Sequence, residues 1–152
     1  MPNWCQNVIY VSHEDKNKMM ALKDAIINHE LCDYIKPMPE ELKDTTAPDD
    51  SPNWYDWAVG NWGTKWDIYS PHDTDEIYSD VDGETYVFKF DTAWAPPIPV
   101  YEEMEKQGFQ LLARYVEYGM GYFGHYSDGS DICGELTDDV MVRDEHLQSE
   151  YA

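Results

Sequence analysis

The segment Ile77–Asp91, with the sequence IYSDVDGETYVFKFD, decides the fold. At its centre lies the dipeptide Asp82-Gly83, which suits the tight primed turn of a β-hairpin because both residues tolerate a positive φ. After this turn, every second residue over 86–90 is aromatic: Tyr86, Phe88 and Phe90. A period of two is typical of a strand with one buried face. The segment therefore predicts two antiparallel strands, over 77–81 and 84–91.

A strand and a helix precede this hairpin. Residues 7–11 are mostly β-branched or aromatic, as in a strand, and Ser12 is placed to cap a helix that continues to about Ile27. The apolar side chains of this helix recur at helical spacing: Met19, Leu22, Ala25 and Ile26. Closer to the hairpin, residues 67–69 predict one further short strand.

A second helix and another strand follow the hairpin. Pro97 or Pro99 can open a helix that Gly108 ends, and residues 109–117 form the next expected strand. The resulting order of strand, helix, strand, strand, helix, strand is the split βαβ plan of ferredoxin-like domains. We therefore expect an α+β fold with a mainly antiparallel sheet and helices on one face. Another extended piece is expected near Tyr122.

Two acidic segments are expected to lie outside this plan. Residues 31–53 are rich in Pro, Asp and Glu and predict a long surface loop inserted into the domain. A short helix follows from Pro52, and Gly60 can end it. Residues 128–152 predict an acidic C-terminal extension, as a solvated arm or an edge strand, on a ferredoxin-like domain formed by residues 1–127.

The charge of the chain is strongly negative. Its 152 residues include 31 acidic and 10 basic ones, a formal net charge of −21, and the acidic excess extends over both halves. Phosphate backbones are bound by clustered Lys and Arg, so this composition disfavours direct nucleic-acid binding over a broad surface. It favours a partner protein with a basic surface, because long-range attraction speeds the encounter. Solubility alone is the other explanation of such a charge.

Cysteine usage and hydropathy indicate the compartment. Cys5, Cys32 and Cys133 are widely separated and form no CxxC pair, which argues against a disulfide framework and against a common zinc site. No stretch approaches the ~20 apolar residues of a membrane span, and the start of the chain lacks the pattern of a signal peptide. We expect a cytoplasmic protein that needs no cofactor.

Tryptophan recurs beside small polar or charged residues at the rims of the expected strands, where loops commonly carry function. The three segments are 1–7 (MPNWCQN), 62–67 (WGTKWD) and 91–97 (DTAWAPP). Lys65 could contact an anion while a Trp ring stacks on a planar ligand, a combination typical of concave binding sites. The candidate ligand-binding residues are Asn3, Trp4, Asn7, Trp62, Thr64, Lys65, Trp66, Asp67, Asp91 and Trp94.

The same segments also fit a purely structural role. In that interpretation the Trp rings fill the core, and Lys65 pairs with Asp67 or Asp91 to hold the rim of the sheet together. The sequence leaves both interpretations open.

Together these motifs resemble the YubB-type ferredoxin-like domain family of bacteriophages, plasmids and some bacteria. The resemblance extends over about residues 1–125 and rests on four motifs: Pro2-Asn3-Trp4-Cys5 with Asn7, Trp62-Gly63-Thr64-Lys65-Trp66-Asp67, Thr92-Ala93-Trp94 with Pro96 and Pro97, and Tyr118-Gly119 leading to Phe123-Gly124. It implies a ferredoxin-like fold and an origin in a mobile element. The family is functionally uncharacterised, so the resemblance implies no activity.

Catalysis would depend on Cys5 or on clustered carboxylates. Cys5 could act as a nucleophile beside a histidine, and His125 lies on a strand that could neighbour the first. The runs 72–76 and 125–133 contain His, Asp, Glu and Cys side chains, but neither completes a known metal loop. We therefore assign no catalytic residue and no metal site.

Charge and resemblance together favour a non-enzymatic phage or plasmid accessory protein that blocks a basic site on a host protein. A host defence factor that binds nucleic acid is one such target, which the acidic surface would imitate. The acidic residues expected to contact the partner are Asp128, Asp131, Glu135, Asp138, Asp139, Asp144 and Glu145. One alternative is a small-ligand or nucleotide-binding protein that uses the Trp, Lys and Asn residues above. The other is an enzyme that uses Cys5 or a carboxylate metal site.

Overall fold

A computed structural model of the chain describes residues 3–70, 78–80 and 83–136. Their strands form one six-stranded antiparallel sheet in the order β2-β3-β1-β4-β5-β6. The strands are β1 (Trp4–Ser12), β2 (Tyr78–Asp80), β3 (Tyr86–Ala93), β4 (Gln110–Glu117), β5 (Tyr122–Ser127) and β6 (Ser130–Glu135). The order of β2, β3, β1 and β4 is that of a split βαβ domain, so the expected ferredoxin-like α+β fold is confirmed.

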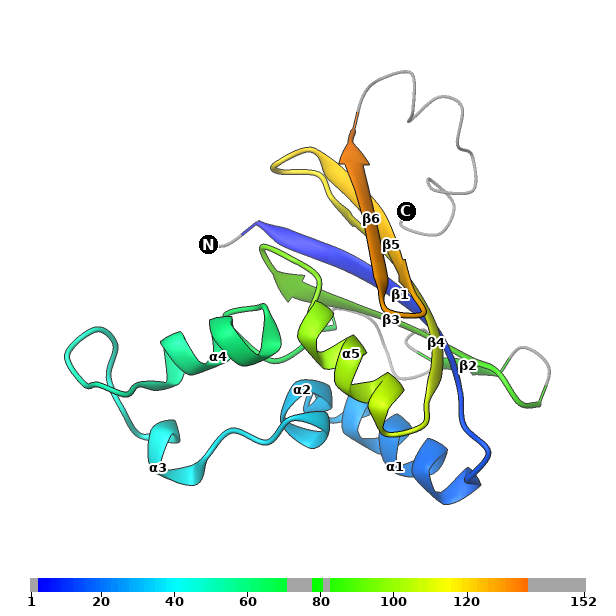
Figure 1. The fold of residues 1–152 in the computed structure, drawn as a ribbon, viewed down its shortest axis with the longest axis horizontal. Coiled ribbons are helices and arrows are strands. Elements are labelled where there is room, and N and C mark those ends of the chain that lie inside the picture. The colour runs from blue at the N-terminus through cyan, green and yellow to red at the C-terminus, as the bar shows by residue number, and fades with distance from the viewer. Residues whose placement is uncertain (1–2, 71–77, 81–82, 137–152) are drawn as a thin grey trace.

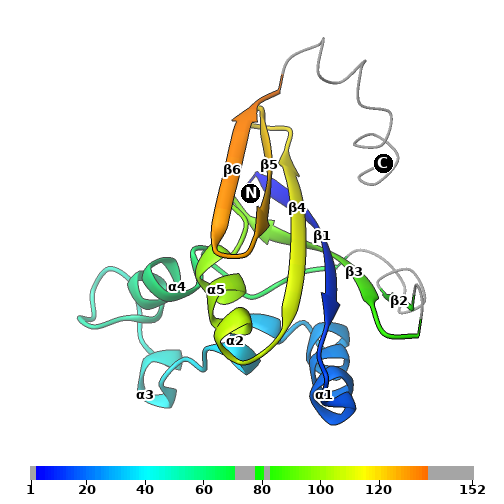
Figure 2. The same cartoon turned by 45° about the vertical axis from the view of Figure 1, so that its right-hand side comes forward.

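The helices gather on one side of the sheet, as Figures 1 and 2 show. They are α1 (Lys16–Ile27), α2 (Leu31–Ile35), α3 (Glu40–Lys43), α4 (Trp54–Trp62) and α5 (Ile98–Lys106). The start of α1 differs from the expectation, because Asp15 and not Ser12 is the N-cap and accepts from the backbone N–H of Asn17. The start of α5 agrees with it, since Pro97 is the N-cap.

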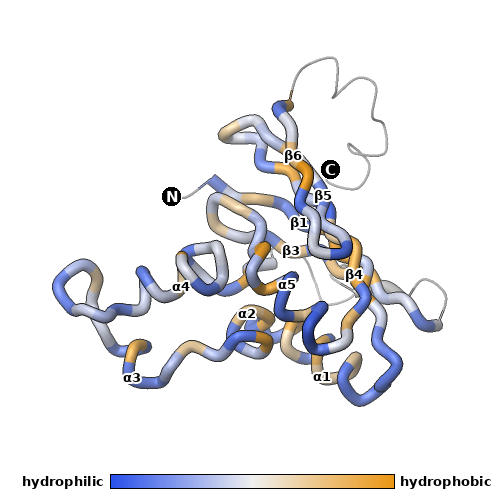
Figure 3. The backbone as a smooth tube through the Cα atoms, viewed as in Figure 1, coloured by the Kyte–Doolittle hydropathy of each residue, from blue (hydrophilic) through white to orange (hydrophobic). Residues whose placement is uncertain are grey.

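The core lies between the sheet and the helices. Alternate residues of β1 and β3 face the helices, and the fully buried ones include Ile9, Val11, Phe88 and Phe90. Leu22 and Ile26 of α1 meet them from the other side, in agreement with the helical spacing of the sequence. In Figure 3 the apolar stretches appear in orange along β4 and on turns of the helices below it.

The segment 31–53 is not the plain surface loop that its composition predicts. It contains α2 and α3, and five of its apolar side chains are buried in the core: Leu31, Cys32, Ile35, Met38 and Leu42. The acidic residues of the segment occupy the remaining, outward positions. The two helices are short and prolines lie between them, so the sequence shows no clear helical spacing of apolar residues. This is why the composition predicts a loop.

Two smaller expectations also change. The helix after Pro52 continues past Gly60 to Trp62, and Gly63 ends it with a left-handed backbone at φ 76°. Only glycine adopts this conformation without strain, so Gly63 is the effective stop. The strand expected at 67–69 is reduced to an isolated bridge between Tyr69 and Asp91 on β3.

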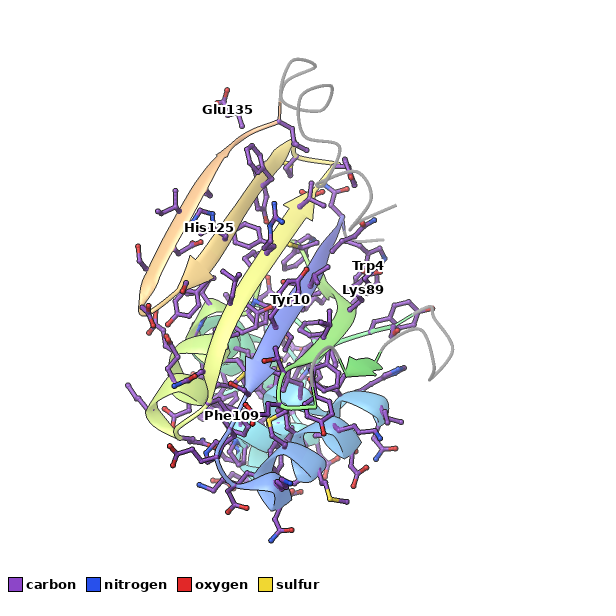
Figure 4. All side chains as sticks on the ribbon, turned by 90° about the vertical axis from the view of Figure 1, so that its right-hand side faces the viewer. Trp4, Tyr10, Lys89, Phe109, His125 and Glu135 are labelled. Carbon is purple, nitrogen blue, oxygen red and sulfur yellow. The ribbon has the colours of Figure 1, made fainter. Side chains whose placement is uncertain are left out.

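The opposite face of the sheet carries a smaller apolar cluster. Val8 and Val116 are buried there and contact Tyr10, Val87 and Phe123. Figure 4 looks onto this face, with Tyr10 on β1 near its middle and His125 on β5 toward one side. The hairpin β5–β6 extends the sheet beyond the split βαβ core, so residues 130–135 form the edge strand that was one of the two expected forms of the C-terminal extension. The rest of that extension, 137–152, lies outside the described residues.

Candidate binding surface

Aromatic rings from four parts of the chain meet at the end of the sheet where β1 begins and β3 ends. The ring of Trp4 lies 6.2 Å from that of Trp66 and 5.4 Å from that of Tyr69, and the ring of Tyr55 lies 6.5 Å from that of Trp94. Such centroid separations are those of interacting aromatic pairs. We call these five residues, together with Lys65, the aromatic surface.

The fold explains why these residues come together. Gly63 ends α4 and turns the chain, so that Lys65 and Trp66 run back past the end of the sheet. Tyr69 is then fixed beside β3 by two backbone hydrogen bonds to Asp91, at 2.9 and 2.6 Å. Trp4 pairs with Ala93, the last residue of β3, and Trp94 follows directly. Three chain segments are thus held at one rim by backbone bonding.

Three residues of this surface are exposed to solvent, and Trp4 and Tyr55 are half-buried. Trp66, Tyr69 and Trp94 are 39%, 46% and 40% exposed, whereas rings of this size are usually largely buried. Neighbouring exposed aromatic residues are characteristic of binding surfaces, since they bury large apolar areas with few rotatable bonds.

Lys65 lies at the centre of the rings. Its Nζ atom is 4.5 Å from the ring centroid of Trp66, 5.5 Å from that of Trp94 and 5.9 Å from that of Tyr55. All three distances are within the range of a cation–π interaction. No ion pair of Lys65 with Asp67 or Asp91 is found between these described residues, so the pairing that the structural interpretation expects is not formed.

Trp94 has an unusual backbone. Its φ is 71°, in the left-handed region that bulky side chains rarely adopt. Its N–H donates to the carbonyl of Asn3 at 2.8 Å, and its own carbonyl accepts from the hydroxyl of Tyr122. These bonds hold a conformation that costs on the order of 1–3 kcal/mol and aim the indole at Lys65.

Two of the predicted site residues, Trp62 and Thr64, have structural roles instead. Trp62 is 5% exposed, packs on Trp57 and donates from Nε1 to the carbonyl of Lys36 at 2.8 Å. Thr64 is buried and donates to the carbonyl of Ala93 at 3.0 Å. These two side chains therefore fit the structural interpretation, in which the tryptophan segments help to form the core.

Asn7 is likewise buried in a polar network. Its Nδ2 donates to Thr92 on β3 at 3.0 Å and to the carbonyl of Cys5 at 3.1 Å, while its Oδ1 accepts from the hydroxyl of Tyr101 at 3.0 Å. The amide is satisfied by its neighbours and joins β1 to β3 and α5. It is therefore unable to fix the edge of a ligand.

Asp67 holds the start of α2. Its Oδ1 accepts from the N–H groups of Cys32 and Ile68, both at 2.8 Å, and its Oδ2 accepts from the N–H of Asp33 at 2.9 Å. Burial raises the pKa of this carboxyl, and the three N–H donors oppose that shift. The carboxylate thus anchors the segment that carries Lys65 and Trp66 to the helix layer.

The last two predicted site residues lie beside the aromatic surface. Asn3 is exposed and contributes its backbone carbonyl to Trp94. Asp91 is half-buried on β3, where it pairs with Tyr69 on one side and with Gln6 of β1 on the other. The predicted set is therefore divided: Trp4, Lys65, Trp66 and Trp94 meet at the surface, and the others support them.

Cys5 lies in a sealed position and lacks the partner that a nucleophile needs. It is 0% exposed, and burial, together with the charge of Glu117, raises the pKa of its thiol far above the usual value. His125 is on β5, separated from β1 by β4, and it lies opposite Arg114 on the face away from the helices. The strand order therefore does not bring His125 beside Cys5, which is the arrangement that a nucleophilic role would have needed.

A buried carboxylate was missed by the sequence reasoning. Glu117 is 0% exposed at the end of β4 and accepts from the N–H groups of Gly119 and Met120. It shapes the turn into β5, which brings Tyr122 to the carbonyl of Trp94. Within the described part of the chain, no group of three or more His, Cys, Asp or Glu side chains could hold a metal ion. The run 72–76 lies outside it.

Three of the expected partner-binding acids can be placed. Asp128, Asp131 and Glu135 are exposed around β6, although Asp131 also accepts from the hydroxyl of Tyr115 at 2.6 Å. Glu135 pairs with Tyr122, which in turn bonds to Trp94, so the acidic edge strand leads toward the aromatic surface. The other four lie outside the described residues: Asp138, Asp139, Asp144 and Glu145.

Sequence reasoning also missed two rings of the surface. Tyr55 precedes the buried Ala58 and Trp62 of α4 by three and seven positions, so helical spacing places it on the core side and gives no signal of its exposure. It is half-buried. Tyr69 follows the buried Ile68 and precedes the buried Ser70, and this alternation marks it as outward.

A concave feature lies away from the aromatic surface, beside the end of β1 and the start of α1. His13, Met20, Tyr86 and Gln110 are among the residues that line this depression, and none of its lining residues belongs to the aromatic surface. No described helix is long and apolar enough to cross a lipid bilayer.

Comparison with known proteins identifies a shared fold. No family model and no curated protein matches the chain. Among solved structures, the crystal structure of protein api92 from Yersinia pseudotuberculosis, which is assigned to the family model DUF1281, is similar with a TM-score of 0.52. The two share 9% identity, and the likeness covers 90% of this chain and 99% of that one. At this identity the likeness establishes the architecture alone.

Proposed function

We propose that this chain is a non-catalytic binding protein that occupies a basic site on a host protein in the cytoplasm. The aromatic surface would be the centre of the contact, and acidic side chains would surround it. The observation that carries the proposal is the exposure of Trp66, Tyr69 and Trp94, which Trp4 and Lys65 connect into one surface, in a chain of net charge −21. An origin in a phage or plasmid rests on the resemblance of the tryptophan motifs.

The two features supply different parts of such an interaction. The acidic charge attracts a basic partner from a distance and speeds association, which falls as salt screens the field. The rings supply affinity at short range, because large aromatic side chains provide most hot spots of protein interfaces. A surface with acids alone would bind many basic proteins, so the rings also supply selectivity.

The buried thiol supports a binding role over catalysis. Cys5 is enclosed and protonated, and its neighbour Glu117 already accepts two backbone N–H groups. A thiol in this state is neither accessible nor activated.

Affinity capture followed by a salt titration tests the proposal. The immobilised protein is incubated with host extract from which nucleic acid has been digested, and the captured protein is purified and titrated at 50 and 300 mM salt. We expect Trp66→Ala to weaken binding about tenfold or more, and higher salt to weaken it further. Tyr34→Ala is the control, because Tyr34 is 41% exposed but lies outside the aromatic surface.

Two results would contradict the proposal. One is a captured partner whose affinity is unchanged by salt. The other is a partner whose affinity responds equally to Trp66→Ala and Tyr34→Ala, since the aromatic surface would then have no special part in binding.

A nucleotide is a second candidate ligand for the same surface. The position of Lys65 among three rings favours it, because a lysine can contact phosphate while a base stacks on an indole. Nucleotides should then raise the melting temperature of the wild type, and Lys65→Met should abolish the increase. A melting temperature that no nucleotide changes would remove this candidate.

A further inference from the structure

Within the described part of the chain, the side chain of Lys65 contacts aromatic rings and no carboxylate. The rings of Tyr55, Trp66 and Trp94, which we call the cation cage, surround its Nζ at 5.9, 4.5 and 5.5 Å. No carboxylate of the described residues forms an ion pair with it, and both oxygens of the adjacent Asp67 already accept backbone N–H groups. The lysine therefore occupies a binding position for a cation without the salt bridge that would fix it there.

The structure points to an occupant from outside the chain. Resting on the proposed function, we propose that the cation cage is the receptor for an arginine side chain of the basic partner, and that Lys65 fills the cage only in the free protein. On binding, the ammonium of Lys65 moves into water and the guanidinium of the partner takes its place between the rings.

The exchange favours arginine because the two cations differ. An ammonium is compact and strongly hydrated. When Lys65 leaves the rings, hydration of its ammonium therefore offsets the lost cation–π contacts. A guanidinium is planar and more weakly hydrated, and it stacks on aromatic faces as well as attracting them through its charge. A lysine from the partner would only replace one ammonium with another and gain little.

The cage is open and already formed. Trp66 and Trp94 are 39% and 40% exposed, so a partner side chain can reach them. Trp94 is fixed by hydrogen bonds on both sides of its left-handed backbone, and Tyr55 is carried by α4. Rings that need no rearrangement lose little entropy when a ligand binds.

The charge of the molecule selects the sign of the ligand. At a net charge of −21 the long-range field attracts cations and opposes nucleotides or other anions. A phosphate would have to approach Lys65 against this field, whereas an arginine approaches along it. The cation is therefore the better match to the same geometry.

Two short peptides of equal charge test the proposal. Each has three basic residues spaced by glycine and serine, arginine in one and lysine in the other, and their affinities are measured by calorimetry at 150 mM salt. The wild type should bind the arginine peptide about twofold to fivefold more tightly. Trp66→Ala should abolish this preference, and Trp66→Phe, which keeps a ring, should retain part of it.

Lys65→Met gives the sharper result. Removal of the competing ammonium should tighten binding of the arginine peptide about twofold to fivefold. Lys18→Met, on the exposed side of α1, removes the same charge away from the cage and is the matched control for the change of net charge. Circular dichroism confirms that each variant is folded.

Three outcomes would overturn the inference: equal affinity of the wild type for both peptides, equal effects of Lys65→Met and Lys18→Met, or weaker binding of the arginine peptide to Lys65→Met. Salt-dependent binding without an arginine preference would reject the cage but leave the proposed function intact. Failure of the proposed function would show itself in the captured partner, whose affinity would not depend on salt.

Discussion

A single residue, Trp94, combines strain and exposure. Its φ of 71° is unfavourable for any residue with a Cβ, and its ring is 40% exposed, so neither local conformation nor burial explains it. Strain of this kind persists where the surroundings impose it, often at binding sites.

Substitution of Trp94 should therefore separate stability from binding. We expect Trp94→Gly to be more stable than Trp94→Ala by about 1 kcal/mol, because glycine adopts a positive φ freely. Both variants should lose binding of the arginine peptide to a similar extent. Urea unfolding measures the difference, and equal stability of the two variants would show that the left-handed backbone is not strained.

The three cysteines should differ in reactivity. Cys5 and Cys32 are buried and burial raises the pKa of both thiols, whereas Cys133 is exposed on β6. One thiol should react rapidly with a maleimide in the native protein at neutral pH, and all three should react in urea. Mass spectrometry counts and locates the labels. Rapid native labelling of Cys5 would contradict its buried position and revive a catalytic role.

At the scale of elements, Asp67 connects the aromatic surface to the helix layer. Asp67→Ala leaves three N–H groups without their acceptor, so we expect it to reduce the free energy of unfolding by about 1–3 kcal/mol. Asp24→Ala, at an exposed position of α1, is the control and should have little effect. Urea denaturation measures both, and an Asp67→Ala variant as stable as the control would refute the anchoring role.

The elements themselves were predictable where the sequence marks their ends. The Asp82-Gly83 dipeptide, the aromatic alternation after it and the prolines before α5 predict the split βαβ order from the sequence, and β3 and α5 are confirmed. Asp82 itself lies outside the described residues. The prediction of a surface loop over 31–53 was wrong, because prolines and acids there surround short helices whose few apolar residues are buried. Composition averaged over such a segment hides individual buried positions.

The site was predictable only as a set of tryptophans. Trp62 and Trp66 are four residues apart in one motif, yet the first is buried and the second exposed. The difference arises at Gly63, where the chain leaves α4. Trp62, inside the helix, faces the core, and Trp66, beyond its end, faces solvent. Which rings meet across segments depends on strand pairing, as for Trp4 with Ala93, and this information is not local.

At the scale of the whole molecule, the charge of −21 should limit stability at low salt. Like charges repel more strongly in the folded state, and the screening length falls from about 30 Å at 0.01 M to about 8 Å at 0.15 M salt. We expect the melting temperature to rise by several degrees over this range. Calorimetry with a chloride salt measures the change, and a melting temperature that falls would show that attractive pairs outweigh the repulsion.

Binding of a cationic partner at the aromatic surface is tested most sharply by an NMR titration that follows the indole N–H signals. The chain has 6 tryptophans, of which Trp66 and Trp94 line the cation cage and Trp62 is buried with its N–H bonded to Lys36. As the arginine peptide is added, the signals of Trp66 and Trp94 should shift to saturation while that of Trp62 stays in place. Saturable binding that leaves Trp66 and Trp94 unshifted would contradict the account.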